Sequence, residues 1–548
     1  MSQIFVSVRQ QYLQLFAASS RHIATSSRPH SEASKAEKPF RSLRAFVRSA
    51  KQETPEPIAT SISGEVPKWI DGSLYRNGPG LFEVGNEKYN HVVDGLSLLH
   101  RFNIKNGQVT YQNRFLRSDH YIKNMKANRI VVSEFGTVGH PDPCQNLFQR
   151  VLSRFKMRKG SENCNVNVMS IKDEMYAMTE SPYIWRIDPK TLESVEKLDI
   201  TEFLAVSMAT AHPHYTNDGT HYNMGSSYGK VAKYNIIKID PADAGQPLLQ
   251  KSSILCSIPG RGRDPSYYHS FGRTDNYFVF VEQPLYINVM KILKATLFRT
   301  SFTDIIEYKP GNKVRFHVVN SRTGEVHSTE YTADAFVCFH HINAYEDDGH
   351  IVVDLCTYKD EEGIYKASVE EMTKAEYVPT QGSKIMRFVL PLTVDKKAGI
   401  HNLVKLPNTE CSARLEDDGS VFCVPERISD AVMELPQINY ASHNGKPYQY
   451  SYGINGDASE IKKKDFKNKS YKAWGMDDYI VSEPVFVAAP SAGSEDDGVV
   501  LTALVSDDPS KKPHLLAILD ARDLKEIGRA EINVDMTSSF HGMFIRNT

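Results

Sequence analysis

Short runs in which apolar and polar residues alternate recur along almost the whole chain after about residue 51. Examples are VTYQNRFLRSD, IVVSEFG, YFVFVEQPL, IVVDLCTY and GVVLTALVS. Alternation with a period of two is typical of β-strands, and turns such as Asp348-Gly349 that separate several runs are typical of hairpins. Helical patterns are few, at 147–157 and 368–375. The sequence therefore predicts an all-β fold, a propeller or a sandwich, without the βαβ spacing of an α/β fold.

Four histidines lie far apart in the chain, each in a strand-like stretch: His212 in TAHPHY, His269 in SYYHSFG, His340 in CFHHINAYED and His541 in SSFHGMF. Such distant residues share one metal ion only if the fold returns repeatedly to one point. A β-propeller does so, because the innermost strand of each blade lies at the central axis. Any one of the 19 histidines is more often a surface or core residue than a ligand. Together, four neutral imidazoles would suit a redox-active iron with open coordination positions.

Three glutamates lie among similarly apolar, strand-like residues: Glu180 in YAMTESPY, Glu434 in VMELPQINY and Glu483 in VSEPVFV. A buried carboxylate needs a hydrogen-bond donor. A metal-bound histidine has a spare ring N–H that a carboxylate accepts, which fixes the tautomer and makes the ring a better ligand. Arginine or backbone partners are an equally good explanation of each glutamate taken alone.

Charge and cysteine content exclude some classes of protein. A formal net charge of -1 and a pI near 7.0 argue against a dedicated nucleic-acid-binding protein. Seven scattered cysteines without a C-x-x-C pair indicate a reducing compartment rather than a disulfide framework. The segment GSSYG at 225–229 matches the nucleophile elbow of α/β-hydrolases, but the residues that follow alternate like a strand where that motif requires a helix.

The first 50 residues differ from the rest of the chain. No acidic residue precedes Glu32, and Arg9, Arg21 and Arg28 punctuate a serine-rich run that follows a helically spaced apolar stripe. This pattern is typical of a mitochondrial transit peptide, with a disordered tail as the alternative. We therefore predict a leader at 1–50, a folded domain at 51–548 and a mitochondrial location. A cytoplasmic, membrane-associated location is the alternative.

A second amphipathic segment lies at 144–159. Its apolar stripe, which begins at Leu147, is bordered by five basic residues. A basic amphipathic helix of this kind can lie in a membrane interface, so we expect peripheral membrane contact here. The alternative is a helix that packs on the propeller. Cys144 is a hypothetical site of acylation or membrane insertion.

Several motifs resemble those of the carotenoid cleavage oxygenase family, in the family's order. They are YRNGPG, YNHVVDG, EFGTVGHPDPCQN, TAHPHYTNDG, SYYHSFG, FHHINAYEDDG, ELPQINY, SEPVFV, EDDGV and the terminal FHG. From about Val66 onward the chain looks most like the animal branch, which contains β-carotene oxygenases and the retinal-pigment-epithelium isomerohydrolase. One family tryptophan-phenylalanine pair is Val92-Val93 here, which puts local packing in doubt but not the metal site.

The resemblance implies a seven-bladed β-propeller with a cap of loops and helices over the metal face. One Fe(2+) per chain would be held by His212, His269, His340 and His541, rather than by the neighbouring His214 or His341. Glu180, Glu434 and Glu483 would lie behind these ligands and hydrogen-bond to them.

The implied activity is that of a non-haem iron dioxygenase. It would use O2 as co-substrate to split a C=C bond of a carotenoid into apocarotenal or retinal products. The arginine-bearing leader favours eccentric 9',10' cleavage. The alternatives are central 15,15' cleavage of β-carotene, a retinoid isomerohydrolase and a non-catalytic carotenoid-binding propeller. The sequence leaves the preferred carotenoid and the oligomeric state open.

Overall fold

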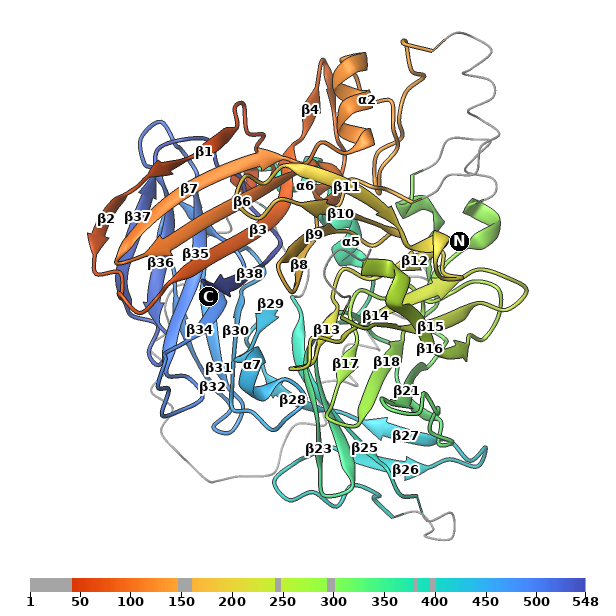
Figure 1. Ribbon diagram of the computed structural model, residues 1–548. Helices are drawn as coiled ribbons and strands as arrows, with labels where there is room; N and C mark the ends of the chain where they lie inside the picture. Colours follow the sequence, from red (N-terminus) through yellow and green to blue (C-terminus); the bar gives the residue numbers. More distant parts are fainter. Residues whose placement is uncertain are drawn as a thin grey trace, which may run out of the picture. The chain divides into compact units, whose positions relative to one another are not determined.

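The structure is a computed structural model that describes residues 42–145, 160–241, 248–292, 301–375, 377, 382–394 and 401–547. Within these residues, seven sheets of four to six strands form the blades of a propeller (Figure 1). Two further pairs of strands lie outside the blades: β4 (Glu83–Val84) with β5 (Glu87–Lys88), and β19 (Leu285–Ile287) with β20 (Ile306–Tyr308). The predicted all-β class and seven-bladed propeller are confirmed.

The first four blades consist of the following strands. The first contains β1 (Thr54–Ala59), β7 (Gln108–Phe115), β6 (Leu96–Lys105), β3 (Gly72–Leu81) and β38 (His541–Arg546); the second contains β11 (Ser194–Asp199), β10 (Tyr183–Ile187), β9 (Glu174–Met178) and β8 (Asn167–Ile171). The third contains β12 (Met208–Ala209), β13 (His214–Tyr215), β14 (His221–Ser227), β15 (Lys233–Ile239) and β16 (Ser252–Pro259); the fourth contains β17 (Gly272–Arg273), β18 (Tyr277–Glu282), β21 (Val314–Asn320), β22 (Tyr331–Ala333), β27 (Val421–Val424) and β26 (Ser412–Leu415).

The last three blades complete the ring. The fifth contains β23 (Val337–Asp347), β24 (His350–Tyr358), β25 (Lys384–Pro391) and β28 (Glu426–Ser429); the sixth contains β29 (Glu434–Gln437), β30 (Tyr450–Ile454), β31 (Ile461–Asp465) and β32 (Ser470–Trp474). The seventh contains β33 (Tyr479–Val481), β34 (Val485–Ala488), β35 (Gly498–Ser506), β36 (His514–Asp520), β37 (Glu526–Ile532) and β2 (Ser61–Gly64).

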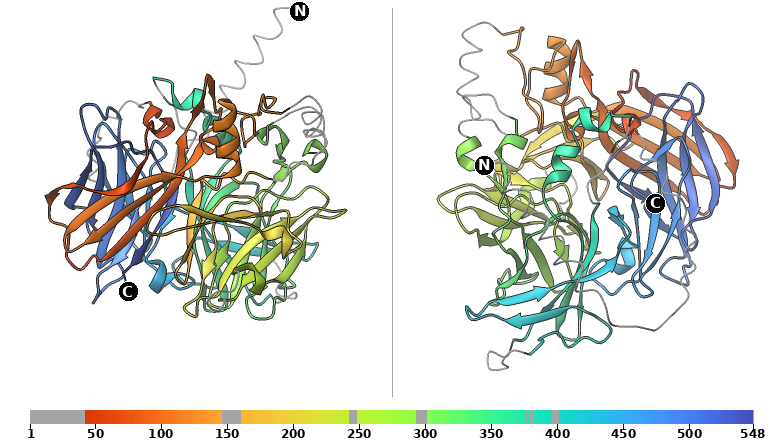
Figure 2. Two further views of the ribbon diagram at one scale, coloured as in Figure 1. Left: turned by 45° about the horizontal axis from the view of Figure 1, so that its top comes forward. Right: turned by 180° about the vertical axis from the view of Figure 1, so that it is seen from behind.

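Both ends of the described chain close the ring. The early strand β2 pairs with β37 in the seventh blade, and the last strand, β38, pairs with β3 in the first blade. Figure 2 shows the resulting contact of the orange first blade with the blue seventh blade. The backbones approach closely here, since a Cβ on Gly542 would lie 2.2 Å from the carbonyl oxygen of Tyr75. Glycine in the terminal FHG motif therefore permits the closing strand to reach its place.

The turn between β23 and β24 follows the sequence prediction. Asp347 pairs with His350, and the two residues between them, Asp348 and Gly349, have φ values of 37° and 73°. Two successive positive φ values define the tight hairpin turn that Asp-Gly favours.

One predicted strand is wrong. Residues 130–136, IVVSEFG, form no strand. The side chain of Asn124 accepts the backbone N–H groups of Val131 and Val132, and Glu87 accepts that of Ile130. Side-chain oxygens thus replace the partner strand that these backbone groups would otherwise need.

The described helices are short, and α2 (Asp119–Ala127), α5 (Glu362–Lys366) and α6 (Val369–Met372) lie together on one side of the sheets (Figure 1). The remaining helical residues described are α7 (Tyr440–His443), residues 289–292 and five 3-10 turns: η1 (Arg44–Val47), η2 (Val92–Asp94), η3 (Ile200–Glu202), η4 (Leu248–Lys251) and η5 (Thr303–Ile305). The helix expected at 368–375 appears in shortened form as α6, which Ser368 caps by accepting the N–H of Glu371. The helix expected at 147–157 lies outside the described residues.

The packed body begins before residue 51. Leu43, Ala45, Phe46 and Val47 are buried in the large core cluster that the first and seventh blades share. Cleavage at residue 50 would remove these side chains from the core, so a cleaved leader would have to end before Leu43. The leader at 1–50 itself stays a prediction. In the described part of the chain, no helix combines the length and hydropathy that a membrane span requires.

Candidate metal centre

Every blade contributes one residue to a single cluster at the inner ends of the sheets. His541 begins β38 of the first blade, His212 lies between β12 and β13 of the third, His269 precedes β17 of the fourth, and His340 lies in β23 of the fifth. The remaining blades supply glutamates: Glu180 follows β9 of the second, Glu434 begins β29 of the sixth, and Glu483 lies between β33 and β34 of the seventh.

The four histidines converge on one point. Each offers one ring nitrogen, and these nitrogens all lie within 4.8 Å of one another. The ring centroids of His212 and His269 are 4.2 Å apart, those of His212 and His541 4.5 Å, and those of His269 and His340 4.7 Å. Residues separated by up to 329 positions thus form one compact group of imidazoles.

Three of the four rings have a carboxylate behind them. The Nδ1 atom of His340 lies 2.6 Å from Oε2 of Glu434, and that of His541 lies 2.8 Å from Oε1 of Glu483. Nδ1 of His269 hydrogen-bonds to Oε1 of Glu180, whose other oxygen accepts the hydroxyl of Tyr267 at 2.7 Å. A carboxylate accepts, so each Nδ1 carries the proton and each Nε2 keeps a bare lone pair.

The nitrogens that face the centre of the cluster lack suitable partners. Nε2 of His340 is buried without a hydrogen bond. Nε2 of His541 lies 3.2 Å from another ring nitrogen, Nε2 of His212. Converging imidazole nitrogens are the donor set that a transition-metal ion requires. The residues present therefore fit a metal ion.

Burial keeps two of these rings, those of His212 and His541, neutral. Burial lowers the pKa of His541 to about 4, although the adjacent Glu483 opposes the shift. Burial and the neighbouring histidines also hold the pKa of His212 well below its ordinary value. Neutral rings present lone pairs at neutral pH, which is the protonation state that a metal ligand needs.

Glu483 is the most enclosed of the three carboxylates, at 1% exposure. It lies 3.1 Å from Nη1 of Arg76, and it accepts Nε2–H of Gln437 at 2.9 Å and the backbone N–H of Gly542 at 3.0 Å. Burial raises its pKa, but His541 and Arg76 lower it by more, so the pKa lies below its ordinary value. The carboxylate is therefore held ionised and fixed in orientation behind His541.

The charges of the cluster favour a divalent cation. Three carboxylates lie behind the histidines, and Arg76 contacts one of them. Counted at formal charge, with the histidines as neutral, three carboxylates and one guanidinium leave an excess of two negative charges. A metal ion of charge +2 would neutralise this excess.

Sequence reasoning did not identify the supporting residues Arg76, Tyr267 and Gln437. Each lies inside a motif that the sequence shows, namely YRNGPG, SYYHSFG and ELPQINY. Their roles depend on contacts across the propeller, such as that between Arg76 and Glu483, which no local pattern contains.

Apolar side chains lie on one side of the histidine cluster, next to His269. The ring of Phe339 lies 6.1 Å from that of His269 and 5.7 Å from that of Tyr358. These residues pack with Phe135 and Met208 against a buried apolar cluster that includes Val337. The histidines thus border an apolar region on this side.

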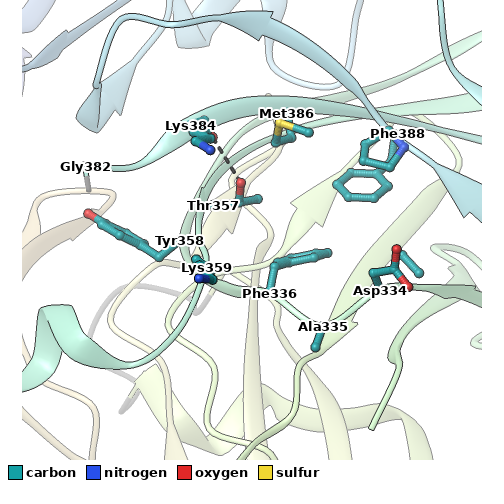
Figure 3. Close-up of a pocket in the computed structure, with 12 residues that line it drawn as sticks. Asp334, Ala335, Phe336, Thr357, Tyr358, Lys359, Gly382, Lys384, Met386 and Phe388 are labelled. Carbon is teal, nitrogen blue, oxygen red and sulfur yellow. Dashed lines mark hydrogen bonds between the residues drawn. The ribbon is translucent and has the colours of Figure 1, made fainter. Parts of the chain in front are cut away.

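A separate pocket of about 210 Å³ lies between the fourth and fifth blades, lined by residues that include Phe336, Tyr358, Met386 and Phe388 (Figure 3). None of the four clustered histidines lines it, and Tyr358 is the lining residue that also contacts Phe339. The pocket is therefore adjacent to the apolar region and distinct from the histidine cluster.

Comparison with known proteins gives matches over nearly the whole chain. The sequence model of the family described as retinal pigment epithelial membrane protein matches residues 47–546. Human β,β-carotene 15,15'-dioxygenase is 43% identical over 520 residues, which cover 91% of this chain and 94% of the relative. The Gallus gallus protein of the same name is 43% identical over 90% of this chain and 97% of the relative. The mitochondrial carotenoid-cleaving dioxygenase of Mustela putorius furo is 41% identical over 90% of this chain and 95% of the relative.

Solved structures share the fold. Cobalt-substituted Synechocystis ACO superposes with a TM-score of 0.72 at 21% identity, covering 92% of this chain and 98% of the other. An ACO/RPE65 chimera gives a TM-score of 0.72 at 21% identity with the same coverage. At this level of identity the similarity shows the propeller fold and nothing finer.

Proposed function

The chain belongs to the retinal pigment epithelial membrane protein family of carotenoid oxygenases, and on this premise we propose that it is a non-haem iron(II) dioxygenase acting on carotenoids. The observation that carries the proposal is the convergence of His212, His269, His340 and His541 from four blades. The names of the relatives supply the reaction class, since those cited above are dioxygenases of carotenoids.

The histidines would hold the iron, and the three glutamates would hold the histidines. Bound iron(II) would supply the electron that allows O2 to react with a conjugated alkene. Glu180, Glu434 and Glu483 keep the proton of their rings on Nδ1, so that Nε2 faces the ion. With only four protein ligands, a bound iron would keep the capacity to take up the reactants.

The apolar region beside the cluster suits a polyene. Phe339 lies next to His269, and Phe135 and Tyr358 belong to the same apolar cluster as Phe339. A carotenoid held against such a surface would be shielded from water, and the depth to which it enters would decide which double bond reaches the metal.

Central 15,15' cleavage is the better-supported position. We expected eccentric 9',10' cleavage from the arginine-bearing leader, but the relatives at 42% to 43% identity are named β,β-carotene 15,15'-dioxygenase. Eccentric cleavage remains the second candidate because the relative at 41% identity is called a mitochondrial carotenoid-cleaving dioxygenase.

Product analysis distinguishes these functions. The purified protein is loaded with iron(II) and given β-carotene under ¹⁸O2, and the products are identified by mass spectrometry. Central cleavage predicts retinal as the sole aldehyde, with labelled carbonyl oxygen, whereas 9',10' cleavage predicts an apocarotenal and an ionone. A protein that leaves β-carotene intact but converts a retinyl ester to 11-cis-retinol would be an isomerohydrolase. If neither β-carotene nor the retinyl ester is consumed and carotenoid stays bound to the protein, the chain is a carotenoid-binding protein.

Location and membrane contact are proposals that the sequence supports. The leader pattern and the mitochondrial relative support a mitochondrial location, with a leader that ends before Leu43. The segment proposed to contact a membrane, 144–159, lies outside the described residues except for Cys144 and Gln145. Cys144 is exposed, which is compatible with its hypothetical acylation.

A further inference from the structure

Ser270 lies between two segments that carry proposed metal ligands. It follows His269 at the inner edge of the fourth blade, and its hydroxyl reaches the residues on both sides of His340 in the fifth blade. Its Oγ atom lies 2.7 Å from the carbonyl oxygen of Phe339, 2.9 Å from the backbone nitrogen of His341 and 2.9 Å from Nδ1 of His341. One side chain therefore makes three hydrogen bonds across the two blades.

The direction of each bond follows from counting protons. A serine hydroxyl has one hydrogen and two acceptor lone pairs. The carbonyl of Phe339 can only accept, so the Ser270 hydrogen points to it. The backbone N–H of His341 donates to one lone pair, and Nδ1–H of His341 donates to the other. The ring of His341 is thus the Nδ1–H tautomer, held to Ser270.

No shared ladder fixes the spacing of these segments. The strand that follows His269, β17, and the strand that contains His340, β23, belong to different sheets. The rings of His269 and His340 nevertheless lie 4.7 Å apart at 87°. Ser270 connects the backbone next to one ligand with the backbone next to the other. The ring of His341 is also enclosed, since a Cβ on Gly272 would lie 3.3 Å from its Cδ2.

We propose that Ser270 is a positioning residue that, through Phe339 and His341, sets the separation and angle of the His269 and His340 rings at the metal. This inference rests on the metal centre proposed above and adds a residue that touches neither metal nor substrate. It also gives His341, the non-ligand histidine of the FHHIN motif, a structural role as the donor that completes the connection.

The test compares Ser270→Ala with Ser266→Ala. Ser266 is buried in the same segment, but its hydroxyl reaches the carbonyls of Tyr267 and Gln283 within the fourth blade. Each apoprotein is titrated with Co²⁺ against a chelator, and the visible spectrum of the bound ion is recorded. We expect Ser270→Ala to weaken Co²⁺ affinity about 10- to 100-fold and to change the spectrum. Ser266→Ala should retain wild-type affinity and spectrum with a comparable loss in the Tm of the apoprotein.

A second pair of variants tests the same connection without altering Ser270. In His341→Asn the amide NH2 can replace Nδ1–H as donor, whereas His341→Leu has none. We expect the asparagine variant to bind Co²⁺ nearly as the wild type does and the leucine variant to resemble Ser270→Ala. This pair decides the matter if Ser270→Ala does not fold.

Equal Co²⁺ affinity and spectra for Ser270→Ala and Ser266→Ala would overturn the role of Ser270, as would equal affinities for the two His341 variants. Failure of the wild-type protein to bind Co²⁺ would be a different result. It would overturn the metal centre itself, and this inference with it.

Discussion

At the scale of single residues, the site depends on which nitrogen of each histidine carries the proton. Glu434 lies 2.6 Å from Nδ1 of His340, and Nε2 of the same ring is buried without a partner. Without the carboxylate, the ring could exchange tautomers or rotate, and its lone pair would face the metal for only part of the time. The carboxylates would therefore contribute to the affinity for a bound metal ion without binding it themselves.

Replacing Glu434 by glutamine should weaken metal affinity about 10- to 100-fold, since the amide is a poorer acceptor of Nδ1–H. Equilibrium competition against a chelator measures the change. Glu282→Gln is the control, because Glu282 is also buried and accepts from His317 at 2.9 Å, but in a group with Arg315 that contains none of the four clustered histidines. Identical metal affinities in the two variants would show that the Glu434 contact does not support the ligand.

The sequence predicted the seven residues of the cluster, but it did not predict the residues that hydrogen-bond to the glutamates. The four histidines and three glutamates each lie in an apolar, strand-like segment, and the family motifs single them out. Arg76 lies in YRNGPG, but its contact with Glu483 joins residues 407 positions apart. The role of Arg76 is therefore visible only in the folded propeller. Metal ligation by the histidines stays a prediction, although the convergence that it requires is present.

At the scale of elements, β38 has two structural roles. It completes the first blade by pairing with β3, and it places His541 in the cluster. The same short strand also brings the N–H of Gly542 to Glu483, so blade closure and the metal site depend on the same residues.

Deleting the chain from Ser539 onward should therefore be severe for its length. We expect a large fall in Tm and loss of metal binding, because β3 loses one of its two neighbouring strands and the cluster loses one of four rings. Differential scanning calorimetry and metal analysis measure the two effects. Deleting only residues 547–548, which follow β38, is the control. A longer truncation with wild-type Tm and metal content would contradict the role given to β38.

The alternating sequence pattern predicted strands correctly where backbone groups of a neighbouring strand satisfy the hydrogen bonds, as in the β23–β24 hairpin. It failed at 130–136, where the side chains of Asn124 and Glu87 satisfy the backbone. It also missed α2, whose buried residues are His120 and Asn124, so the helix has no apolar stripe to recognise.

At the scale of the whole molecule, several neutral histidines are buried away from the metal cluster. Burial lowers the pKa of His91 and of His514 to about 4, and that of His100 to about 3. In His91 and His514 the Nδ1 atom accepts a backbone N–H, from Val93 and Ser506 respectively. Protonation of Nδ1 would break these bonds.

The fold should therefore lose stability as the pH falls from 6.5 towards 4. In this window the unfolded chain, with histidine pKa values near 6.5, binds more protons than the folded chain. Each such histidine lowers the free energy of unfolding by about 1.4 kcal/mol per pH unit. Burial raises the pKa of Asp94 to about 7. Protonation of this one carboxyl group stabilises the fold as the pH falls, but it is outweighed by the three histidines.

Denaturant unfolding of the metal-free protein at several pH values measures this slope. His514→Asn keeps an acceptor for the N–H of Ser506 but cannot titrate, so its slope should be smaller by about 1.4 kcal/mol per pH unit. Unfolding free energies that do not change across this pH range would contradict the assignment of buried neutral histidines.

The most direct test of the account is X-ray absorption at the iron edge of the reconstituted protein, with the iron content measured on the same sample. We predict one iron per chain with four imidazole nitrogens from His212, His269, His340 and His541, and no sulfur neighbour. A spectrum that requires fewer than three imidazoles or a thiolate, or a protein that retains no iron, would contradict the claim that four blades hold one ferrous ion.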